Sequence, residues 1–325
     1  MVGRIAAEIA RVAPGAAKGV VAVSGGRDSM ALMVATSVMV AANQSMTCTV
    51  AHVHHHQRPE ADDECELVRR TAASLGLAFE LRHLEVDPGE PPSSLREARY
   101  RELLDVAIAT GSSWIATAHQ AQDQLETVLL AMVRGAGPAG LVGMGSVRAL
   151  GEDILLVRPM LEVDRAEVTA LCEQAGVVWC DDPGNEDPGT LRGLLRRDVL
   201  PVLESMRPGV AKRLSATREI RQAAADALKA AVLAPFEGAW PRAALAALPM
   251  GLRRATLHAA ATALAGGADG IGSEPIRAAA RAVADTRMHR RCYELGCGVE
   301  LTLEAAHVRI DGARSQPEME AHPPR

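Results

Sequence analysis

The chain has 325 residues, enough for one large or two ordinary domains, and its 48% hydrophobic and 23% charged residues are typical of a globular protein. This composition excludes a disordered chain, a collagen-like chain and a bundle of membrane helices. Aromatic residues make up only 2% and the net charge is −5, which argues against a protein that stacks many unpaired bases or attracts nucleic acid over its whole surface.

Short apolar runs alternate with helical patterns over the first two hundred residues. The predicted strands are residues 20–23, 47–53, 79–86, 114–118 and 154–157. The predicted helices that follow them are residues 28–42, 62–75, 94–110, 122–134 and 164–175. This alternation predicts parallel β-α-β units and therefore an α/β fold with a doubly wound parallel sheet. Ligands bind such sheets at the carboxyl ends of the strands, where the polar motifs described below fall.

The pattern changes near residue 208. The Ala-rich stretch 210–285 is predicted to be helical throughout, with breaks at Pro and Gly residues. Two short alternating segments, 292–303 and 307–310, predict a small hairpin. The expected parts are a catalytic domain, a smaller and mainly helical domain, and a disordered tail, at residues 1–208, 209–314 and 315–325.

Neither a membrane segment nor an export signal is predicted. The longest apolar stretch, residues 30–42, is too short to cross a bilayer. The N-terminal segment has an amphipathic pattern with charged residues, unlike a signal peptide. The six cysteines form no C-x-x-C pair, which favours reduced thiols. We therefore expect a cytoplasmic protein without a membrane partner.

The strongest local signal is a glycine-rich loop that directly follows the first predicted strand and opens a helix. Its residues are Ser24, Gly25, Gly26, Arg27, Asp28 and Ser29. Glycines allow a tight turn, while backbone N–H groups, serine hydroxyls and the helix N-terminus favour an anion. The loop is not a Walker A motif, and an acid beside phosphates suggests that Mg²⁺ lies between them. The alternative is an ordinary N-capped turn. The strand, loop and helix together favour pyrophosphate binding.

A second polar cluster follows the fourth predicted strand, in the run A-H-Q-A-Q-D-Q-L-E-T from residue 118. Asp123 and Glu126 are three residues apart and so share a helix face, and His119 is expected to face the same crevice as the glycine-rich loop. Acids in a first helical turn are also favoured by the helix dipole alone. We favour a functional role over that simpler explanation.

Histidines 52, 54, 55 and 56 follow the second predicted strand. The side chains of His52, His54 and His56 would lie on one face of an extended segment, as in a metal site. No Cys and no second His pair with ligand spacing accompanies them. A strand end beside a nucleotide is sufficient reason for polar residues, and we favour that interpretation over a metal site.

Residues 188–221 carry eight basic and three acidic side chains, a local net charge of +5 in an acidic chain. Such a stripe suits a phosphate backbone, and it equally suits a solvated helical face. The basic residues are Arg192, Arg196, Arg197, Arg207, Lys212, Arg213, Arg218 and Arg221.

The motifs, in this order, resemble those of the tRNA(Ile)-lysidine synthetases, a family of PP-loop ATP pyrophosphatases. The resemblance covers about residues 18–208. Besides the runs above it includes R-x-x-R-Y from residue 96, R-G-A-G-P-A-G-L-V-G-M from residue 134, D-D-P-G-N-E-D from residue 181 and R-G-L-L-R from residue 192. It implies the adenine nucleotide alpha hydrolase-like fold followed by a helical domain.

The resemblance also implies a reaction. Members of this family use ATP and Mg²⁺ to adenylate C2 of the wobble cytidine in the CAU anticodon of tRNA(Ile), and L-lysine then displaces AMP. Homodimers are common among them. For this chain it implies ATP binding by the loop and His52, with Asp28 near Mg²⁺, and catalytic roles for Asp28, His119, Asp123 and Glu126. The implied tRNA contacts are Arg96, Arg99, Arg134, Arg192, Arg196 and Arg197.

Three positions depart from the family pattern. Gln122 stands where an acid is usual, His56 where Gly is usual and Gly193 where Asn is usual. One interpretation of these departures is a change of substrate. We also expect tRNA recognition without an additional C-terminal domain. The rival interpretations are a thiolation enzyme of the same superfamily, which the lack of C-x-x-C pairs disfavours, and a non-catalytic nucleotide-binding module.

Overall fold

We analysed the protein in a computed structural model, which describes residues 1–312 except 14, 16, 44, 57–60, 85–91, 181–188, 236, 268–269 and 286–289. The chain divides into two compact units, Met1–Gln222 and Ala223–Arg325. The predicted boundary near residue 208 lies before this division. The difference arises from α9 (Val210–Ala216), which packs against α5 (Ala121–Val133) of the first unit.

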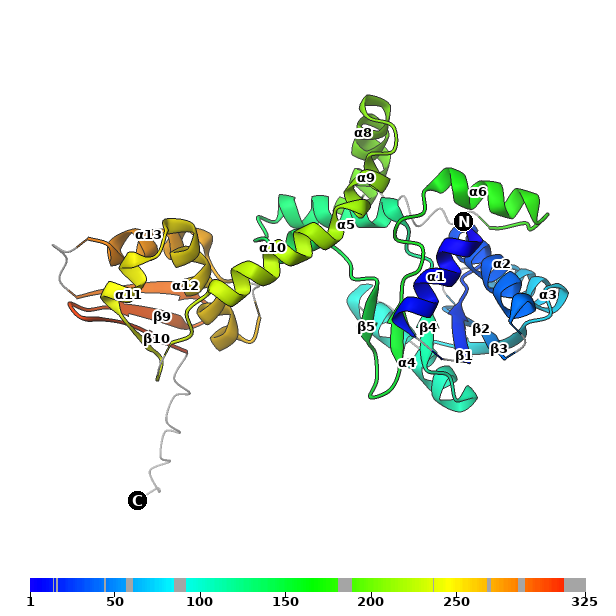
Figure 1. The fold of residues 1–325 in the computed structure, drawn as a ribbon, viewed down its shortest axis with the longest axis horizontal. Helices are drawn as coiled ribbons and strands as arrows, with labels where there is room; N and C mark the ends of the chain where they lie inside the picture. Colours follow the sequence, from blue (N-terminus) through cyan, green and yellow to red (C-terminus); the bar gives the residue numbers. More distant parts are fainter. Residues whose placement is uncertain are drawn as a thin grey trace, which may run out of the picture. The chain divides into compact units, whose positions relative to one another are not determined.

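The first unit is built on a six-stranded sheet with the order β3-β2-β1-β4-β6-β5 (Figure 1). Only β5 is antiparallel to its neighbour, so the predicted parallel α/β sheet is confirmed. The strands are β1 (Lys18–Ala22), β2 (Thr47–His54), β3 (Ala78–His83), β4 (Trp114–Ala116), β5 (Val147–Ala149) and β6 (Leu155–Val157). The short, fully exposed β5 was not predicted, because it carries no apolar run.

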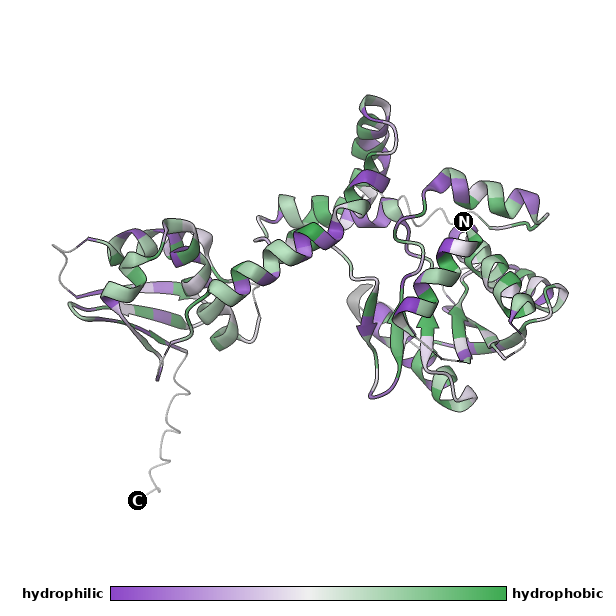
Figure 2. Ribbon diagram, viewed as in Figure 1, coloured by the Kyte–Doolittle hydropathy of each residue, from purple (hydrophilic) through white to green (hydrophobic). Residues whose placement is uncertain are grey.

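Helices cover both faces of this sheet. On one face, buried side chains of the strands pack with α1 (Val2–Val12), α2 (Arg27–Ala42), α3 (Ala61–Ser74) and α6 (Arg165–Gln174). On the other face the strands pack with α4 (Pro92–Thr110). Figure 2 shows the central strands and α2 mostly in the hydrophobic colour. The near-continuous apolar sequence of α2 is explained by this burial on nearly all sides.

The close packing of β1 against β4 depends on one glycine. Gly19 pairs with Trp114 across the two parallel strands. A Cβ atom at residue 19 would lie 2.1 Å from the indole ring of Trp114, a distance that no real contact permits. The ring is completely buried in this position. Gly19 is therefore required for close approach of the indole rather than for backbone freedom.

After the sheet, the first unit continues in short helical segments. These are η1 (Gly140–Val142), α7 (Leu191–Leu194), a wide π-type turn at Leu195–Val199, α8 (Leu200–Met206) and α9. The helix α10 (Arg218–Ala231) runs across the division between the two units. None of the helices in the described ranges is long and apolar enough to cross a membrane.

The second unit has its own core between helices and a four-stranded antiparallel sheet of order β7-β10-β9-β8. The predicted hairpin is thus part of a larger sheet. The break expected near Pro241 in the helical stretch 210–285 is a strand, β7, which was not itself predicted and whose Trp240 is buried in the core. Its elements are β7 (Ala239–Pro241), α11 (Arg242–Ala247), α12 (Met250–Ala265), α13 (Ser273–Val283), β8 (Arg291–Gly296), β9 (Val299–Leu303) and β10 (His307–Asp311). The predicted disordered tail lies outside the described residues.

Candidate active site

The glycine-rich loop joins the end of β1 to the start of α2 and is held by its own serines. Gly25 has a φ of +92°, a conformation that favours glycine. The Ser29 hydroxyl donates to the Gly26 carbonyl (2.8 Å) and accepts from the Ser24 backbone N–H (3.1 Å). Ser29 is only 6% exposed, so in this structure its hydroxyl braces the loop. The loop therefore presents a preformed turn at a helix N-terminus, the geometry suited to an anion.

A segment distant in sequence fixes the same loop. The backbone N–H of Cys180 donates to the Gly25 carbonyl (3.0 Å), and Gly26 forms an isolated bridge with Cys180. The acidic motif at 181–187 lies outside the described residues, but it follows Cys180 directly in the chain. Cys180 was not predicted as a site residue because no motif marks it.

Asp28 is linked to Asp123 through one glutamine. Gln120 donates from its side-chain nitrogen to Asp28 Oδ2 (2.8 Å), and its backbone N–H donates to Asp123 Oδ2 (2.9 Å). Burial, opposed by Arg27 and reinforced by the charge of Asp123, raises the pKa of Asp28 above its ordinary value. Gln120 was missed by the sequence analysis, because a neutral amide beside an acid gives no distinctive signal. The structure thus connects the two predicted acidic positions.

Asp28 also has an oxygen suited to a cation. Its Oδ1 atom is buried and has no hydrogen-bond partner within the described residues, although Arg27 Nε lies 3.6 Å away. A buried carboxylate oxygen without a partner is costly unless a cation or water satisfies it. Carboxylate oxygen is the ligand type that Mg²⁺ prefers, and the donor therefore fits Mg²⁺.

Glu126 lies beneath two arginines and is completely buried. Arg192 Nε donates to Oε2 (2.8 Å), and Arg196 Nε donates to Oε1 (2.6 Å). Arg196 also donates to Asp123 Oδ1 (2.9 Å). Since both carboxylate oxygens of Glu126 are occupied by arginines, the structure gives Glu126 the role of positioning these side chains. Asp123 caps α5 and holds Arg196 at the same time.

His119 precedes α5, and its Nδ1 atom lies 3.0 Å from Thr117 Oγ1. Burial, together with the positive charges of Arg158 and Arg99, lowers the pKa of His119 from 6.5 to about 3. The imidazole is therefore neutral near pH 7. A neutral ring donates one hydrogen bond and accepts another, but it is a weak proton acceptor in this environment.

His52 ties β2 to the beginning of the loop. Its Nδ1 atom lies 2.8 Å from the Val23 carbonyl, so this nitrogen carries the proton. The residue is 4% exposed, and burial lowers its pKa below the ordinary value of 6.5. His52 therefore supports the segment that leads into the glycine-rich loop.

Arg96 and Arg99 of α4 both lie near the ring of Tyr100, and each guanidinium carbon is 5.7 Å from the ring centroid. Arg148 approaches the same ring more closely, at 4.9 Å. Arg158, which is 5% exposed, donates to the Gly145 carbonyl (2.7 Å). Arg148 and Arg158 were not predicted as site residues, because they are scattered in the sequence and meet only in the fold. This cluster makes the surroundings of Tyr100 strongly basic.

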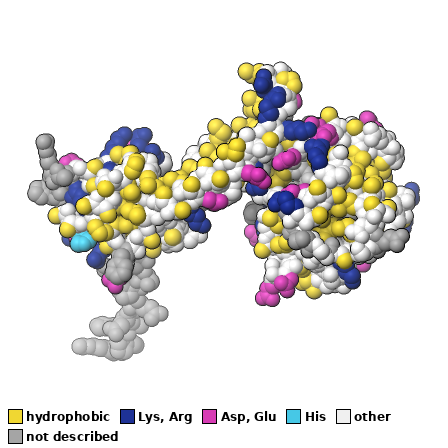
Figure 3. All heavy atoms as spheres, viewed as in Figure 1, with side chains coloured by type: hydrophobic (Ala, Val, Ile, Leu, Met, Phe, Trp, Pro, Cys, Tyr) yellow, Lys and Arg dark blue, Asp and Glu magenta, His cyan; other side chains and the backbone are white. Residues whose placement is uncertain are grey.

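The remaining predicted arginines are less closely associated with these residues. Arg134 caps the far end of α5, about 17 Å along the helix from Asp123 in the first turn. Arg197 is exposed and pairs with its neighbour Asp198 (2.8 Å). Further along the basic stripe, Lys212 contacts Glu167 (3.0 Å). Figure 3 shows basic and acidic side chains side by side on the first unit. Much of the predicted basic stripe is thus neutralised by ion pairs.

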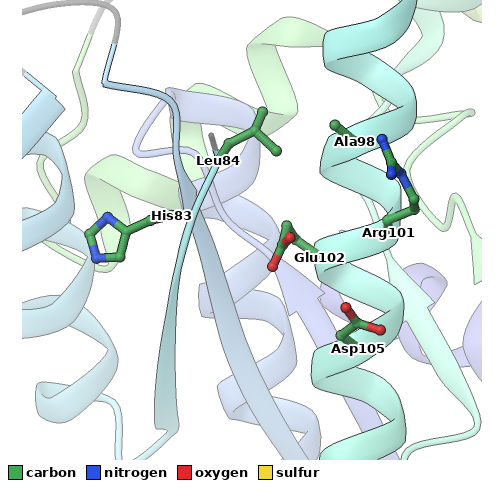
Figure 4. Close-up of a pocket in the computed structure, with 6 residues that line it drawn as sticks. All are labelled: His83, Leu84, Ala98, Arg101, Glu102 and Asp105. Atoms are coloured by element: carbon green, nitrogen blue, oxygen red, sulfur yellow. The ribbon is translucent and has the colours of Figure 1, made fainter. Parts of the chain in front are cut away.

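A surface pocket lies between β3 and α4, lined by His83, Leu84, Ala98, Arg101, Glu102 and Asp105 (Figure 4). It contains none of the predicted site residues. Its charged side chains come from one exposed part of α4, and we do not assign it to the reaction.

The fold and the loop define a nucleotide-binding protein of the PP-loop class. The sequence pattern of the PP-loop domain, an ATP-binding family, matches residues 3–203. A tRNA(Ile)-lysidine synthase of Salinispora arenicola is 39% identical over 229 residues, which cover 69% of this chain and 68% of that relative. The enzyme of the same name from Methylobacterium nodulans is 43% identical over 233 residues, covering 68% and 67%. The chain belongs to the tRNA(Ile)-lysidine synthase family.

A solved structure agrees with this fold. A U34-tRNA thiolase from Methanococcus maripaludis, determined with its [4Fe-4S] cluster, superposes with a TM-score of 0.57 at 17% identity, over 67% of this chain and 76% of that one. At this identity the likeness concerns the fold alone. The predicted fold class and family are confirmed, and the two rival interpretations are not favoured.

Proposed function

We propose that this protein is an ATP-dependent ligase that joins L-lysine to C2 of the wobble cytidine in the CAU anticodon of tRNA(Ile). The observation that carries the proposal is the pair of hydrogen bonds that link Asp28 to Gln120 and Gln120 to Asp123. They connect the glycine-rich loop at the end of β1 to the start of α5. They join a site for triphosphate to a second acidic position in a chain of this family.

The proposed reaction has two steps. In the first, the carbonyl oxygen on C2 of cytidine attacks the α-phosphorus of ATP, and pyrophosphate leaves. In the second, the neutral ε-amine of lysine attacks C2, the C–O bond breaks, AMP leaves with that oxygen, and the amine loses a proton. The turn at Gly25 and Gly26 and the N-terminus of α2 would stabilise the negative charge on the departing pyrophosphate.

Mg²⁺ would be held through Asp28, whose Oδ1 atom is buried without a hydrogen-bond partner in the described part of the chain. When bound, the ion would neutralise charge on the phosphates. Gln120 fixes the other oxygen of Asp28 and so orients the carboxylate. Ser24, Arg27, Ser29 and His52 would support the bound ATP.

The proposed tRNA surface lies beside these residues. Arg192 is 40% exposed although its Nε atom is bonded to buried Glu126, so a fixed guanidinium edge remains accessible to a phosphate. Arg96 and Arg99 form the basic surroundings of Tyr100. Arg134, Arg196 and Arg197 complete the set, and Glu126 acts by holding Arg192 and Arg196.

We also propose that the protein works in the cytoplasm, where ATP and tRNA are both present.

A homodimer is proposed as well, from an exposed apolar face. Val199, Val202 and Met206 follow one another at helical spacing and are 36%, 53% and 76% exposed. Figure 3 shows apolar side chains gathered with basic ones over α8 and α9. A second copy of the chain would cover this apolar face. The molar mass from light scattering tests the dimer: we expect a dimer for the wild type and a monomer for Met206→Glu. A monomeric wild type would refute the proposed dimer.

Mass spectrometry of the wobble nucleoside tests the proposed reaction. Transfer RNA(Ile) with the CAU anticodon is incubated with enzyme, ATP, Mg²⁺ and isotopically labelled lysine, and each component is omitted in turn. We expect a nucleoside that carries the lysine label only in the complete mixture, with one AMP and one pyrophosphate per product. A sulfur-containing nucleoside, or pyrophosphate release without label in the RNA, would refute the proposal.

A further inference from the structure

Three histidines meet where β2 and β3 end, outside the proposed reaction site. His54 and His83 are register partners in the parallel pair β2–β3, so both side chains lie on the same face of the sheet. His56 follows two residues after His54. A ring nitrogen from each of the three lies within 4.8 Å of one from each of the others. Figure 4 shows that the His83 ring points away from α4, to the opposite side of β3.

The rings of His56 and His83 already share one hydrogen bond. His56 Nε2 lies 2.8 Å from His83 Nδ1, and the two rings are stacked with centroids 4.9 Å apart. Each of these ring nitrogens can be the donor or the acceptor, depending on the tautomer. One proton is therefore shared between His56 Nε2 and His83 Nδ1. His56 reaches this place with a left-handed backbone (φ +52°), an uncommon conformation for a residue other than glycine.

An unsatisfied nitrogen of His54 is a second, independent indication that these histidines bind a ligand. It is 4% exposed, and its Nε2 atom has no hydrogen-bond partner among the residues that the structure describes. Asp62, at the start of α3, places its Oδ1 atom 3.2 Å from this nitrogen without hydrogen-bond geometry. His54 Nδ1 receives only a long hydrogen bond, 3.3 Å, from the His56 backbone. A buried imidazole with one nitrogen unsatisfied costs free energy that a ligand could recover.

We propose that His54, through its unsatisfied Nε2 atom, binds a divalent transition-metal ion together with His56 and His83, with the Asp62 carboxylate as fourth ligand. Zinc is the natural probe for this site. Neutral imidazole is a preferred ligand for zinc, and tetrahedral sites with three histidines are well known. The proposed set differs from the sequence hypothesis, because His83 replaces His52, which is committed to Val23.

The required movement is small. Two nitrogens bound to a tetrahedral zinc are about 3.4 Å apart, as follows from zinc–nitrogen bonds of about 2.0–2.1 Å. His56 Nε2 and His83 Nδ1 would therefore separate by roughly half an ångström as the shared proton leaves and zinc enters. The ion would join the ends of β2 and β3 to the first turn of α3, the helix that packs on both strands. We infer a structural site, because none of its ligands belongs to the proposed catalytic set.

Zinc affinity of the full-length protein tests this proposal. The protein is freed of metal with a chelator, and zinc binding is measured by competition with a chromophoric chelator, without ATP or Mg²⁺. Cobalt(II) spectra report the coordination geometry. We expect one zinc per chain, tetrahedral cobalt absorption, and a dissociation constant that rises at least about tenfold in His83→Ala and in His56→Ala. Both side chains are exposed, so the variants should fold.

His307→Ala is the matched control, because His307 is also an exposed histidine on a strand but belongs to the second unit. Its zinc affinity should equal that of the wild type. Zinc should also raise the melting temperature of the wild type and not that of His83→Ala. Absence of a one-to-one site, or equal affinity in wild type and His83→Ala, would overturn the proposal while leaving the proposed ligase activity untouched.

Discussion

Asp28 has a half-buried carboxylate with one buried, unsatisfied oxygen, and this combination predicts the behaviour of Asp28→Asn. We expect AMP formation to fall by about 10²-fold or more, because the variant loses the charge that would hold Mg²⁺. AMP release in the presence of tRNA and lysine measures the effect. Asp153→Asn, at an exposed acid of the first unit, is the control and should keep full turnover.

The same variant should not lose stability. The raised pKa of Asp28 means that the native state holds its proton more tightly than the unfolded chain does. Its contribution to stability is therefore present at low pH and is lost as the pH rises above the ordinary value of 3.8. At neutral pH the ionised, partly desolvated carboxylate therefore costs stability, and asparagine removes this cost. The melting temperature of Asp28→Asn should equal or exceed that of the wild type. A marked decrease would show that the charge stabilises the fold.

His119 is neutral throughout the physiological range, which predicts a simple pH dependence. With its pKa lowered to about 3, its ionisation should contribute no inflection to kcat/KM between pH 5 and 8. His119→Asn should lower the rate while leaving the shape of the profile unchanged. If an inflection near pH 6 disappears in this variant, His119 titrates during the reaction and the assignment of a neutral ring is wrong.

At the scale of single residues, the sequence identified which side chains carry charge in this region but not how they pair. Asp123 and Glu126 share a helix face, as their spacing predicts. Only the fold shows that Glu126 is sealed beneath arginines from a segment some seventy residues away. Gln120 was missed for a related reason, since its importance comes from its two partners and not from its own chemistry.

The ion pairs between α5 and the segment beginning at α7 predict a stability effect. Arg196→Ala removes one of the two arginines that pair with buried Glu126 and leaves Arg192 as its partner among the described residues. We expect a loss of about 3 kcal/mol in the free energy of unfolding, near the lower end for breaking a buried pair, because Arg192 remains. Urea denaturation measures it. The double variant Glu126→Gln/Arg196→Ala should recover part of the loss. If the losses in unfolding free energy of the two single variants simply add in the double variant, the buried pairing is contradicted.

Among the elements, segments with a clear periodic or apolar pattern were predicted well, and segments without one were not. The strands β1, β2 and β4 and the helices α2 and α5 lie within a few residues of their predicted limits. Strands β5 and β7 were missed because β5 has no buried residue and β7 ends in a proline, so neither shows the buried apolar run that marks the equally short β4. Their formation depends on neighbouring strands that offer free backbone groups, which is information that a local pattern does not contain.

On the scale of the whole molecule, two separate hydrophobic cores predict two unfolding transitions. One core surrounds the larger sheet, and the other lies in the second unit around Trp240. Because ATP is proposed to bind only the first unit, calorimetry with ATP at a hundredfold excess over its Kd should stabilise one transition by about 2.7 kcal/mol. The other transition should stay in place. A single transition that shifts as a whole would mean that the units unfold together.

The fit of an indole ring over Gly19 carries a consequence for how this chain can vary. A methyl group at position 19 and a tryptophan at position 114 exclude each other sterically. A larger residue at position 19 therefore requires a smaller side chain at position 114. In a library randomised at both, functional clones with tryptophan at 114 should all retain glycine at 19, while alanine at 19 should recur only beside a smaller ring or an aliphatic side chain. Covariation of this pair would thus record a contact between neighbouring parallel strands.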